Sequence, residues 1–174
     1  MFRSKKVFRI IVASVCLLVS AQGASTPRPV ADVPISVAGG KPMKLSQYRG
    51  KVLVVALIST TCVHCIASLQ MLGKLQKEFA PQGFQALGIA ADDNAATGVA
   101  GLARLQLGFP LGYLDQTNTM QVFDFKLEDH PFVPIYMFVD RKGTIRFQYS
   151  GKEDFFKNEE PNTRLLVQNL LKQK

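Results

Sequence analysis

The sequence predicts an α/β domain with a central mixed sheet flanked by helices. Three observations carry this prediction: two continuously apolar segments typical of buried strands, helix-periodic segments that alternate with them, and an alternating hairpin pattern near the C-terminus. With 174 residues, of which 47% are hydrophobic and 20% charged, the chain has the size and composition of one globular domain. These values exclude a disordered tail, a collagen-like repeat and a multidomain protein.

The N-terminus has the pattern of a secretory signal peptide over residues 1–23. Four basic residues precede an apolar core at 10–19, and small residues at 21–23 form a cleavage site before Ala24. We therefore expect the domain to be periplasmic or otherwise exported. The apolar run is shorter than the roughly 18 residues of a spanning helix, so we expect membrane attachment only if this signal stays uncleaved.

The charge balance argues against a nucleic-acid partner. The chain carries a formal net charge of +8, but four of its 21 Lys and Arg residues lie in the signal peptide, which leaves 17 against 13 acidic residues. The remaining basic residues are scattered and lack interleaved aromatics, which is typical of an ordinary solvated surface.

The expected domain begins after a short connecting segment. Residues 24–34 are proline-rich and lack periodicity, which predicts a linker. The domain itself, at 35–174, opens with two short strands, 35–37 and 43–45, which form an N-terminal β-hairpin around a glycine turn. Ser46 then caps a brief helical turn.

The next elements surround a cysteine motif. Residues 51–58 are apolar and β-branched after Lys51, which predicts a central strand buried on both faces. Thr-Thr-Cys-Val-His-Cys at 60–65 follows directly. Apolar residues then recur at helical spacing over 66–79, and 84–90 is a second buried strand. The motif is therefore expected where a strand gives way to a helix.

The remaining elements complete the alternation of strands and helices. They are, in order, a polar turn at 92–94 that can cap, a helix at 95–107, a strand at 109–114, a helix at 117–125, hairpin strands at 135–139 and 144–149, and a helix at 158–174. The alternation predicts parallel pairing for the early strands, and the hairpin closes the sheet antiparallel. The expected core-facing stripe of the last helix consists of Leu165, Leu166, Leu170 and Leu171.

The cysteine content indicates redox chemistry. Apart from Cys16 in the signal peptide, the chain contains only Cys62 and Cys65, in a Cys-x-x-Cys arrangement. Backbone N–H groups at the start of a helix stabilise a thiolate at Cys62, and Cys65, one turn on, is placed to attack a mixed disulfide. His64 either stabilises that thiolate, which makes the disulfide more oxidising, or is an exposed residue with no redox role.

Several short motifs resemble the TlpA/ResA-type thioredoxin-like thiol-disulfide oxidoreductases of the redoxin or AhpC-TSA superfamily, over roughly residues 33–172. The residues that carry the resemblance are Gly40-Lys-Pro-Met-Lys-Leu-Ser-Gln-Tyr-Arg-Gly-Lys-Val52, the Cys-x-x-Cys pair after a buried strand, Gln82-Gly83, Asp92-Asp93, Phe109-Pro110, Asp115, Val133-Pro134 and Asp140-Arg-Lys-Gly143. The resemblance implies a thioredoxin-like fold with an N-terminal β-hairpin and an inserted strand–helix segment.

The resemblance also implies roles for individual residues. Cys62 is the nucleophile and Cys65 the resolving thiol. Pro134 is a cis-proline that lies against the active site, although the sequence alone equally allows an ordinary trans proline. The Val133 backbone pairs with the substrate chain. Asp93 matches the position of an acid in ResA-like members and either assists deprotonation of Cys65 or caps a helix.

The implied substrates are exported proteins that contain disulfides or dithiols, together with a redox partner. Thr61, which replaces the tryptophan of most relatives, and Val63 are expected to face the substrate at a more open site. We expect a monomer that uses neither cofactor nor metal.

The chain departs from related patterns in ways that leave two alternatives. Ala56 stands where thioredoxins bury an acid, which puts the usual proton relay in doubt. A peroxiredoxin-like peroxidase is one alternative, but Val55 and Ser59 replace the proline and threonine of its peroxide pocket. The other is a thiol module in which the two cysteines and His64 or His130 hold Cu(I) or Zn(II).

Overall fold

The computed structural model describes residues 25–129 and 131–173. The predicted signal peptide and His130 lie outside the described residues. The strands are β1 Arg28–Pro29, β2 Val52–Ile58, β3 Phe84–Ala90, β4 Leu111–Tyr113, β5 Ile135–Val139 and β6 Thr144–Ser150. The α-helices are α1 Val63–Phe79, α2 Ala95–Leu102, α3 Gln116–Phe123 and α4 Glu159–Lys172. Short 3-10 turns, such as Leu45–Tyr48, occur between them.

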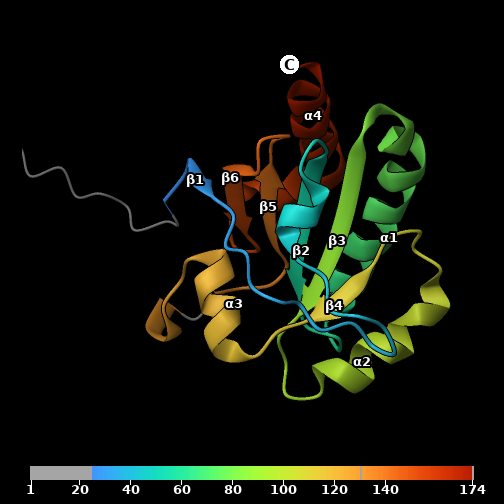
Figure 1. Cartoon of the computed structure of the whole chain (residues 1–174), viewed down its shortest axis with the longest axis vertical. Helices are drawn as coiled ribbons and strands as arrows, with labels where there is room; N and C mark the ends of the chain where they lie inside the picture. Colours follow the sequence, from blue (N-terminus) through green and yellow to red (C-terminus); the bar gives the residue numbers. More distant parts are fainter. Residues whose placement is uncertain (1–24, 130, 174) are drawn as a thin grey trace, which may run out of the picture.

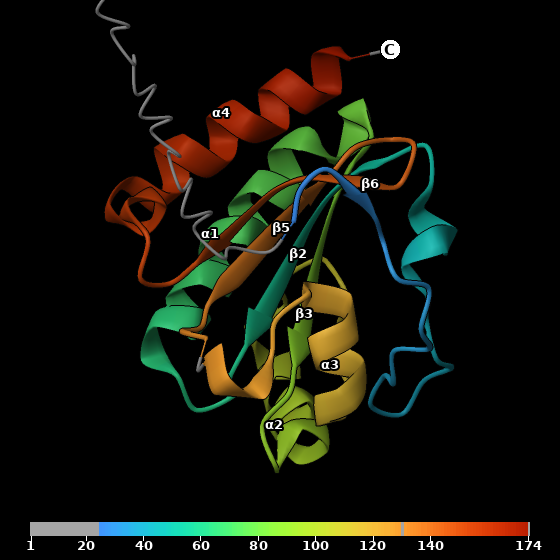
Figure 2. The ribbon, with the colours of Figure 1, turned by 90° about the vertical axis from the view of Figure 1, so that its left-hand side faces the viewer.

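The six strands form one mixed sheet in the order β1-β6-β5-β2-β3-β4 (Figure 1). β2 pairs parallel with β3, and β3 with β4, whereas β5 pairs antiparallel with both β2 and β6. Helices α1 and α4 lie on one face, and α3 lies with the N-terminal segment on the other (Figure 2). The predicted α/β class with a mixed sheet is confirmed.

Strand β2 occupies the centre of the sheet because all of its side chains are apolar. All seven residues of Val52–Ile58 are buried, and their side chains alternate between the two hydrophobic layers above and below the sheet. Its C-terminal end leads through four residues into α1, so the cysteine motif lies at the carboxyl edge of the central strand. This is the edge at which open α/β sheets carry their sites.

The N-terminal segment differs from the expectation in two respects. The expected hairpin is reduced to one antiparallel bridge between Ile35 and Met43, whose backbones exchange hydrogen bonds of 2.8 and 2.9 Å. Within the expected linker, β1 pairs with β6 at the edge of the sheet. The Arg28 guanidinium, which donates to Gln148 at 2.8 Å, fixes this segment to the domain.

Helices α2 and α4 also differ in detail from the helices expected over 95–107 and 158–174. The helix expected over 95–107 ends at Leu102 and continues as a 3-10 turn. In α4, Val167 and Leu170 are buried, whereas Leu165 of the expected stripe is 56% exposed. The buried face of α4 thus differs from the expected one, because the packing of α4 against the sheet, rather than the positions of its leucines, determines which face is covered.

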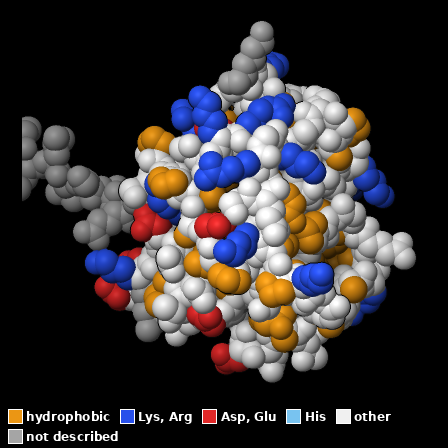
Figure 3. All heavy atoms as spheres, viewed as in Figure 1, with side chains coloured by type: hydrophobic (Ala, Val, Ile, Leu, Met, Phe, Trp, Pro, Cys, Tyr) orange, Lys and Arg blue, Asp and Glu red, His pale blue; other side chains and the backbone are white. Residues whose placement is uncertain are grey.

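None of the helices in the described parts of the chain is long and apolar enough to cross a membrane. Basic side chains are spread among uncharged ones over the face shown in Figure 3.

Candidate active site at the start of helix α1

Cys62 occupies the N-cap position of α1. Its sulfur accepts a hydrogen bond from the backbone N–H of Cys65 at 3.2 Å, and its side chain is partly exposed. An N-cap group faces the unpaired N–H groups and the positive end of the helix dipole, both of which stabilise a negative charge. The fold thus presents a partly exposed sulfur at the start of a helix, next to a backbone N–H donor.

Cys65, one helical turn on, has the opposite environment. It is fully buried, and burial, reinforced by the contact with the Cys62 sulfur, raises the pKa of its thiol to about 12. Both cysteines are free thiols in this structure. The pair therefore combines an exposed sulfur with a shielded one that stays protonated at neutral pH.

The three predicted neighbours of the cysteines lie at the surface of the motif. Thr61, Val63 and His64 are exposed, Val63 to 78%. The Thr61 hydroxyl lies 3.2 Å from that of Ser59. The motif is thus at the surface of the domain, and contact of Thr61 and Val63 with a substrate stays a prediction.

The loop before β5 lies close to the motif. The peptide bond between Val133 and Pro134 is cis, in agreement with the geometry that the resemblance implied, and Pro134 is buried. Val133 and Ser59 line one hollow of about 400 Å³ together with Asp92. The chain thus brings Val133, the residue predicted to pair with substrate, beside the segment that leads into Cys62.

The acid that contacts the motif segment is Asp92, not Asp93. The Asp92 carboxylate accepts hydrogen bonds from the Thr60 backbone N–H at 2.5 Å and from the Thr60 hydroxyl at 3.1 Å. Asp93 is exposed. The turn at 92–94 was expected to cap the next helix, but the N-cap residue of α2, Asn94, makes no side-chain hydrogen bond to the helix backbone. The resemblance pointed to Asp93, and its assistance in deprotonating Cys65 stays a prediction.

Helix α2 packs closely against the same threonine. A Cβ atom on Gly98 would lie 2.3 Å from the Thr60 hydroxyl oxygen, so only glycine allows this approach. Thr60 is therefore held between Asp92 and Gly98, two residues before Cys62. This contact fixes the loop from which α1 starts.

We expect Asp92→Ala to lower the free energy of unfolding by about 1–2 kcal/mol, because the partly buried Thr60 backbone N–H and hydroxyl lose their acceptor. Asp93→Ala is the matched control and should change it by less than about 0.5 kcal/mol, since its side chain is exposed. Urea denaturation of the two variants checks the difference. Equal stabilities would show that the Thr60 contact contributes nothing.

A buried tyrosine takes the place opposite Ala56. Tyr136 of β5 pairs with Ala56 of β2, and its hydroxyl donates to a carboxylate oxygen of Glu159 at 2.5 Å. Neither residue was predicted from the sequence to belong to the site. The available signal was one hydroxyl-bearing residue in the otherwise apolar segment 135–139.

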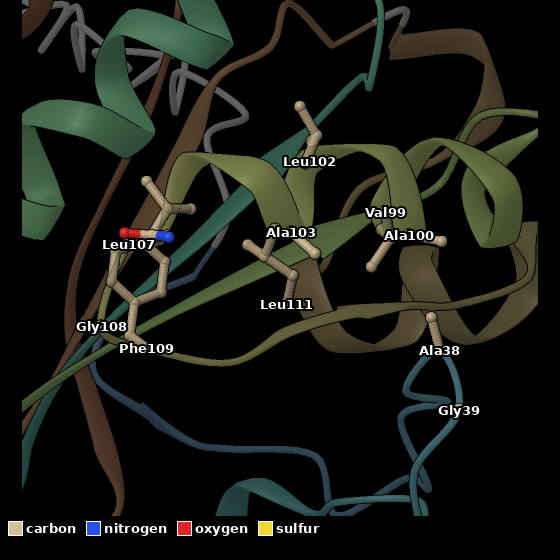
Figure 4. A pocket seen from close by; sticks show the side chains of 11 residues that line it. Ala38, Gly39, Val99, Ala100, Leu102, Ala103, Leu107, Gly108, Phe109 and Leu111 are labelled. Carbon is tan, nitrogen blue, oxygen red and sulfur yellow. The ribbon is translucent and has the colours of Figure 1, made fainter.

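A larger hollow, of about 610 Å³, lies elsewhere on the domain, between α2 and the loop at Ala38–Gly39 (Figure 4). Apolar residues such as Val99, Leu102 and Phe109 line it, and neither cysteine is among the lining residues. It is therefore separate from the candidate site.

The metal alternative has no preformed site in the described part of the chain. Among residues 25–129 and 131–173, no three His, Cys, Asp or Glu side chains are grouped closely enough to hold a metal ion. His130, which the sequence analysis named as a third ligand, lies outside these residues.

The sheet order and the placement of Cys-x-x-Cys between the central strand and α1 define a thioredoxin-like fold. A family model described as "AhpC/TSA family" matches residues 27–148, and the chain belongs to this family. The expected resemblance is thereby confirmed at the level of family and fold.

Individual relatives agree with this assignment. Protein FixW of Rhizobium leguminosarum is 34% identical over 113 residues, which are 59% of this chain and 51% of that protein; the chain thus spans about half of the relative's length. A structure described as thiol:disulfide interchange protein DsbE from Chlorobium tepidum aligns with a TM-score of 0.72 at 17% identity and covers 86% of this chain and 99% of its own. The thioredoxin domain of a thiol-disulfide oxidoreductase from Bacteroides vulgatus aligns with a TM-score of 0.64 at 17% identity, and the alignment covers 82% of this chain and 98% of that domain. At such identities the likeness concerns the fold.

Proposed function

We propose that the protein is a thiol-disulfide oxidoreductase that exchanges disulfides of exported proteins through Cys62 and Cys65. The observation that carries this proposal is the asymmetry of the pair. Cys62 is accessible and accepts an N–H hydrogen bond at a helix N-terminus, whereas Cys65 is buried one turn away. One sulfur is suited to attack a partner and the other to release it.

The reaction proceeds by two exchanges. The Cys62 thiolate attacks one sulfur of a substrate disulfide, whose S–S bond breaks, and the departing sulfur takes the electron pair and a proton. Cys65 then loses its proton and attacks Cys62, which breaks the mixed disulfide and releases the second substrate thiolate. The substrate gains two electrons, and the protein ends with a Cys62–Cys65 disulfide. The same steps in reverse oxidise a substrate dithiol.

The surface near the motif supports a polypeptide substrate. Val63 and Phe132 are large apolar side chains that are 78% and 51% exposed. Lys152 lies over the Phe132 ring, 3.7 Å from its centroid. Val63 adjoins Cys62 in the chain and Phe132 adjoins Val133, so exposed apolar side chains lie next to both residues that are proposed to meet a partner chain, and Val133 provides backbone groups for pairing with it.

The proposal of an exported protein is based on the signal-peptide pattern of the N-terminal sequence. Cleavage after residue 23 would leave an exported domain in which Cys62 and Cys65 are the two cysteines. The mass of the mature chain checks this assignment, and a cytosolic chain that retains Met1 would contradict it.

Metal-free protein is expected to catalyse the exchange of insulin disulfides with dithiothreitol or glutathione. Equilibration with glutathione gives the potential of the pair and hence the direction of electron flow. Metal-free protein that is inactive in this assay but binds Cu(I) through both thiols would favour the metal module instead. Rapid peroxide turnover without disulfide exchange would favour the peroxidase.

A further inference from the structure

The second exchange step requires a proton acceptor near Cys65. The thiol is fully buried, so bulk water does not reach it, and its pKa of about 12 keeps it protonated until it attacks. At the strand position where thioredoxins bury an acid, this chain has Ala56, and its methyl group cannot accept a proton. If the proposed disulfide exchange operates, another group must take this proton.

Tyr136 is placed where that acid would act. It lies directly across from Ala56 in the antiparallel β2–β5 pair, so the two side chains project from the same face of the sheet. Tyr136, Ala56 and Cys65 belong to one buried cluster beneath α1. Ser68, one turn after Cys65 on α1, is buried as well.

The Tyr136 hydroxyl is connected to a carboxylate. It donates to Glu159 at 2.5 Å, while the ring is enclosed by Phe138, Phe155 and Phe156 at centroid distances of 6.3, 6.3 and 5.2 Å. Burial, followed by the charge of Glu159, raises the pKa of Tyr136 well above its usual value, and the charge of Cys65 acts in the same direction. Tyr136 is thus a neutral hydroxyl that is hydrogen-bonded to a carboxylate.

Glu159 provides a route to solvent. It is the first residue of α4 and is half-buried, so its carboxylate has one end at Tyr136 and access to water at the other. The ionisable groups whose charges act on Tyr136 are Glu159 from α4 and Cys65 from α1. The arrangement therefore extends from the buried cluster that Cys65 and Tyr136 share, through the Tyr136–Glu159 hydrogen bond, to the half-buried Glu159.

We propose that Tyr136 and Glu159 form a proton relay for Cys65. When Cys65 attacks Cys62, its proton passes to the Tyr136 oxygen while the Tyr136 proton passes to the Glu159 carboxylate. The new S–S bond forms as the bond between Cys62 and the substrate sulfur breaks, and the electron pair leaves on the substrate thiolate, which takes a proton from water. Glu159 then releases its proton to solvent, so charge and atoms balance.

The reaction of the reduced protein with Ellman's reagent isolates this step. Attack by Cys62 releases one thionitrobenzoate in a phase whose rate depends on reagent concentration. Attack by Cys65 on the resulting mixed disulfide releases the second in a unimolecular phase. We expect Glu159→Gln and Tyr136→Phe to slow the second phase at pH 7 by about tenfold or more and to leave the first unchanged.

Glu159→Gln is the decisive variant, because glutamine keeps an acceptor for the Tyr136 hydroxyl but takes no proton. Glu160→Gln is the matched control, since Glu160 contacts Arg164 at 3.4 Å and not Tyr136. The melting temperature of each variant is measured alongside. If Glu159 acted only through its negative charge, its removal would make Cys65 easier to deprotonate and would speed the second phase. A second phase in Glu159→Gln that is as fast as in the wild type, or faster, therefore overturns the relay. Wild-type protein that releases no second thionitrobenzoate overturns the proposed function and, with it, the relay.

Discussion

Replacing Cys62 by serine is expected to reduce insulin disulfide exchange to the uncatalysed background. The sulfur of Cys62 is the accessible member of the pair, and a serine hydroxyl at the same N-cap keeps the cap but is not a nucleophile toward disulfides. Cys65→Ser is expected to keep the first exchange and lose the second. It should therefore accumulate protein joined through Cys62 to its substrates.

Electrophoresis without reductant, followed by mass spectrometry, identifies these mixed disulfides. Gln70→Ala is a suitable control, because Gln70 is an exposed residue of α1 beyond the motif and both cysteines remain. Mixed disulfides that form through Cys65 in the Cys62→Ser protein would reverse the assigned roles of the two thiols.

Alkylation of the reduced protein by iodoacetamide at pH 8 is expected to label Cys62 at least about a hundredfold faster than Cys65. With a pKa of about 12, only about one Cys65 in 10⁴ is a thiolate at this pH, and the side chain is also fully buried. Because a higher pH increases the thiolate fraction, labelling of Cys65 should rise about tenfold per unit while the protein stays folded.

Peptide mass spectrometry after timed quenching measures both rates. In guanidinium chloride the two cysteines should react at similar rates, which separates the effect of the fold from the effect of the sequence. Faster labelling of Cys65 than of Cys62 in the folded protein would contradict the proposed division of roles.

The two buried strands β2 and β3 and the position of the motif could be predicted from the sequence because local composition dictates them. Residues 84–90 were predicted as a strand and form β3 with the same bounds, and the apolar run at 51–58 contains β2. Each is continuously apolar and therefore suited to burial on both faces. Cys62 precedes helix-periodic residues and follows this strand, so its place at the helix start also followed from local pattern.

Contacts between distant segments could not be predicted in the same way. The covered face of α4 depends on the sheet beneath it, which is why Leu165 is exposed although it is as apolar as Leu170. Pairing of Arg28–Pro29 with β6 joins residues more than a hundred positions apart, and a two-residue strand has no periodicity to indicate it.

The sequence by itself determined the class of the fold, the central strand and the pair of thiols that follows it. Only the tertiary structure decided which acids contact the site. Asp92 and Asp93 are adjacent and chemically identical, but only Asp92 is turned toward Thr60. Glu159 is 23 residues from Tyr136 and meets it because α4 packs on the face of the sheet from which Tyr136 projects. A hydrogen bond depends on the position and direction of both partners, and for residues this far apart the packing of the whole domain sets these.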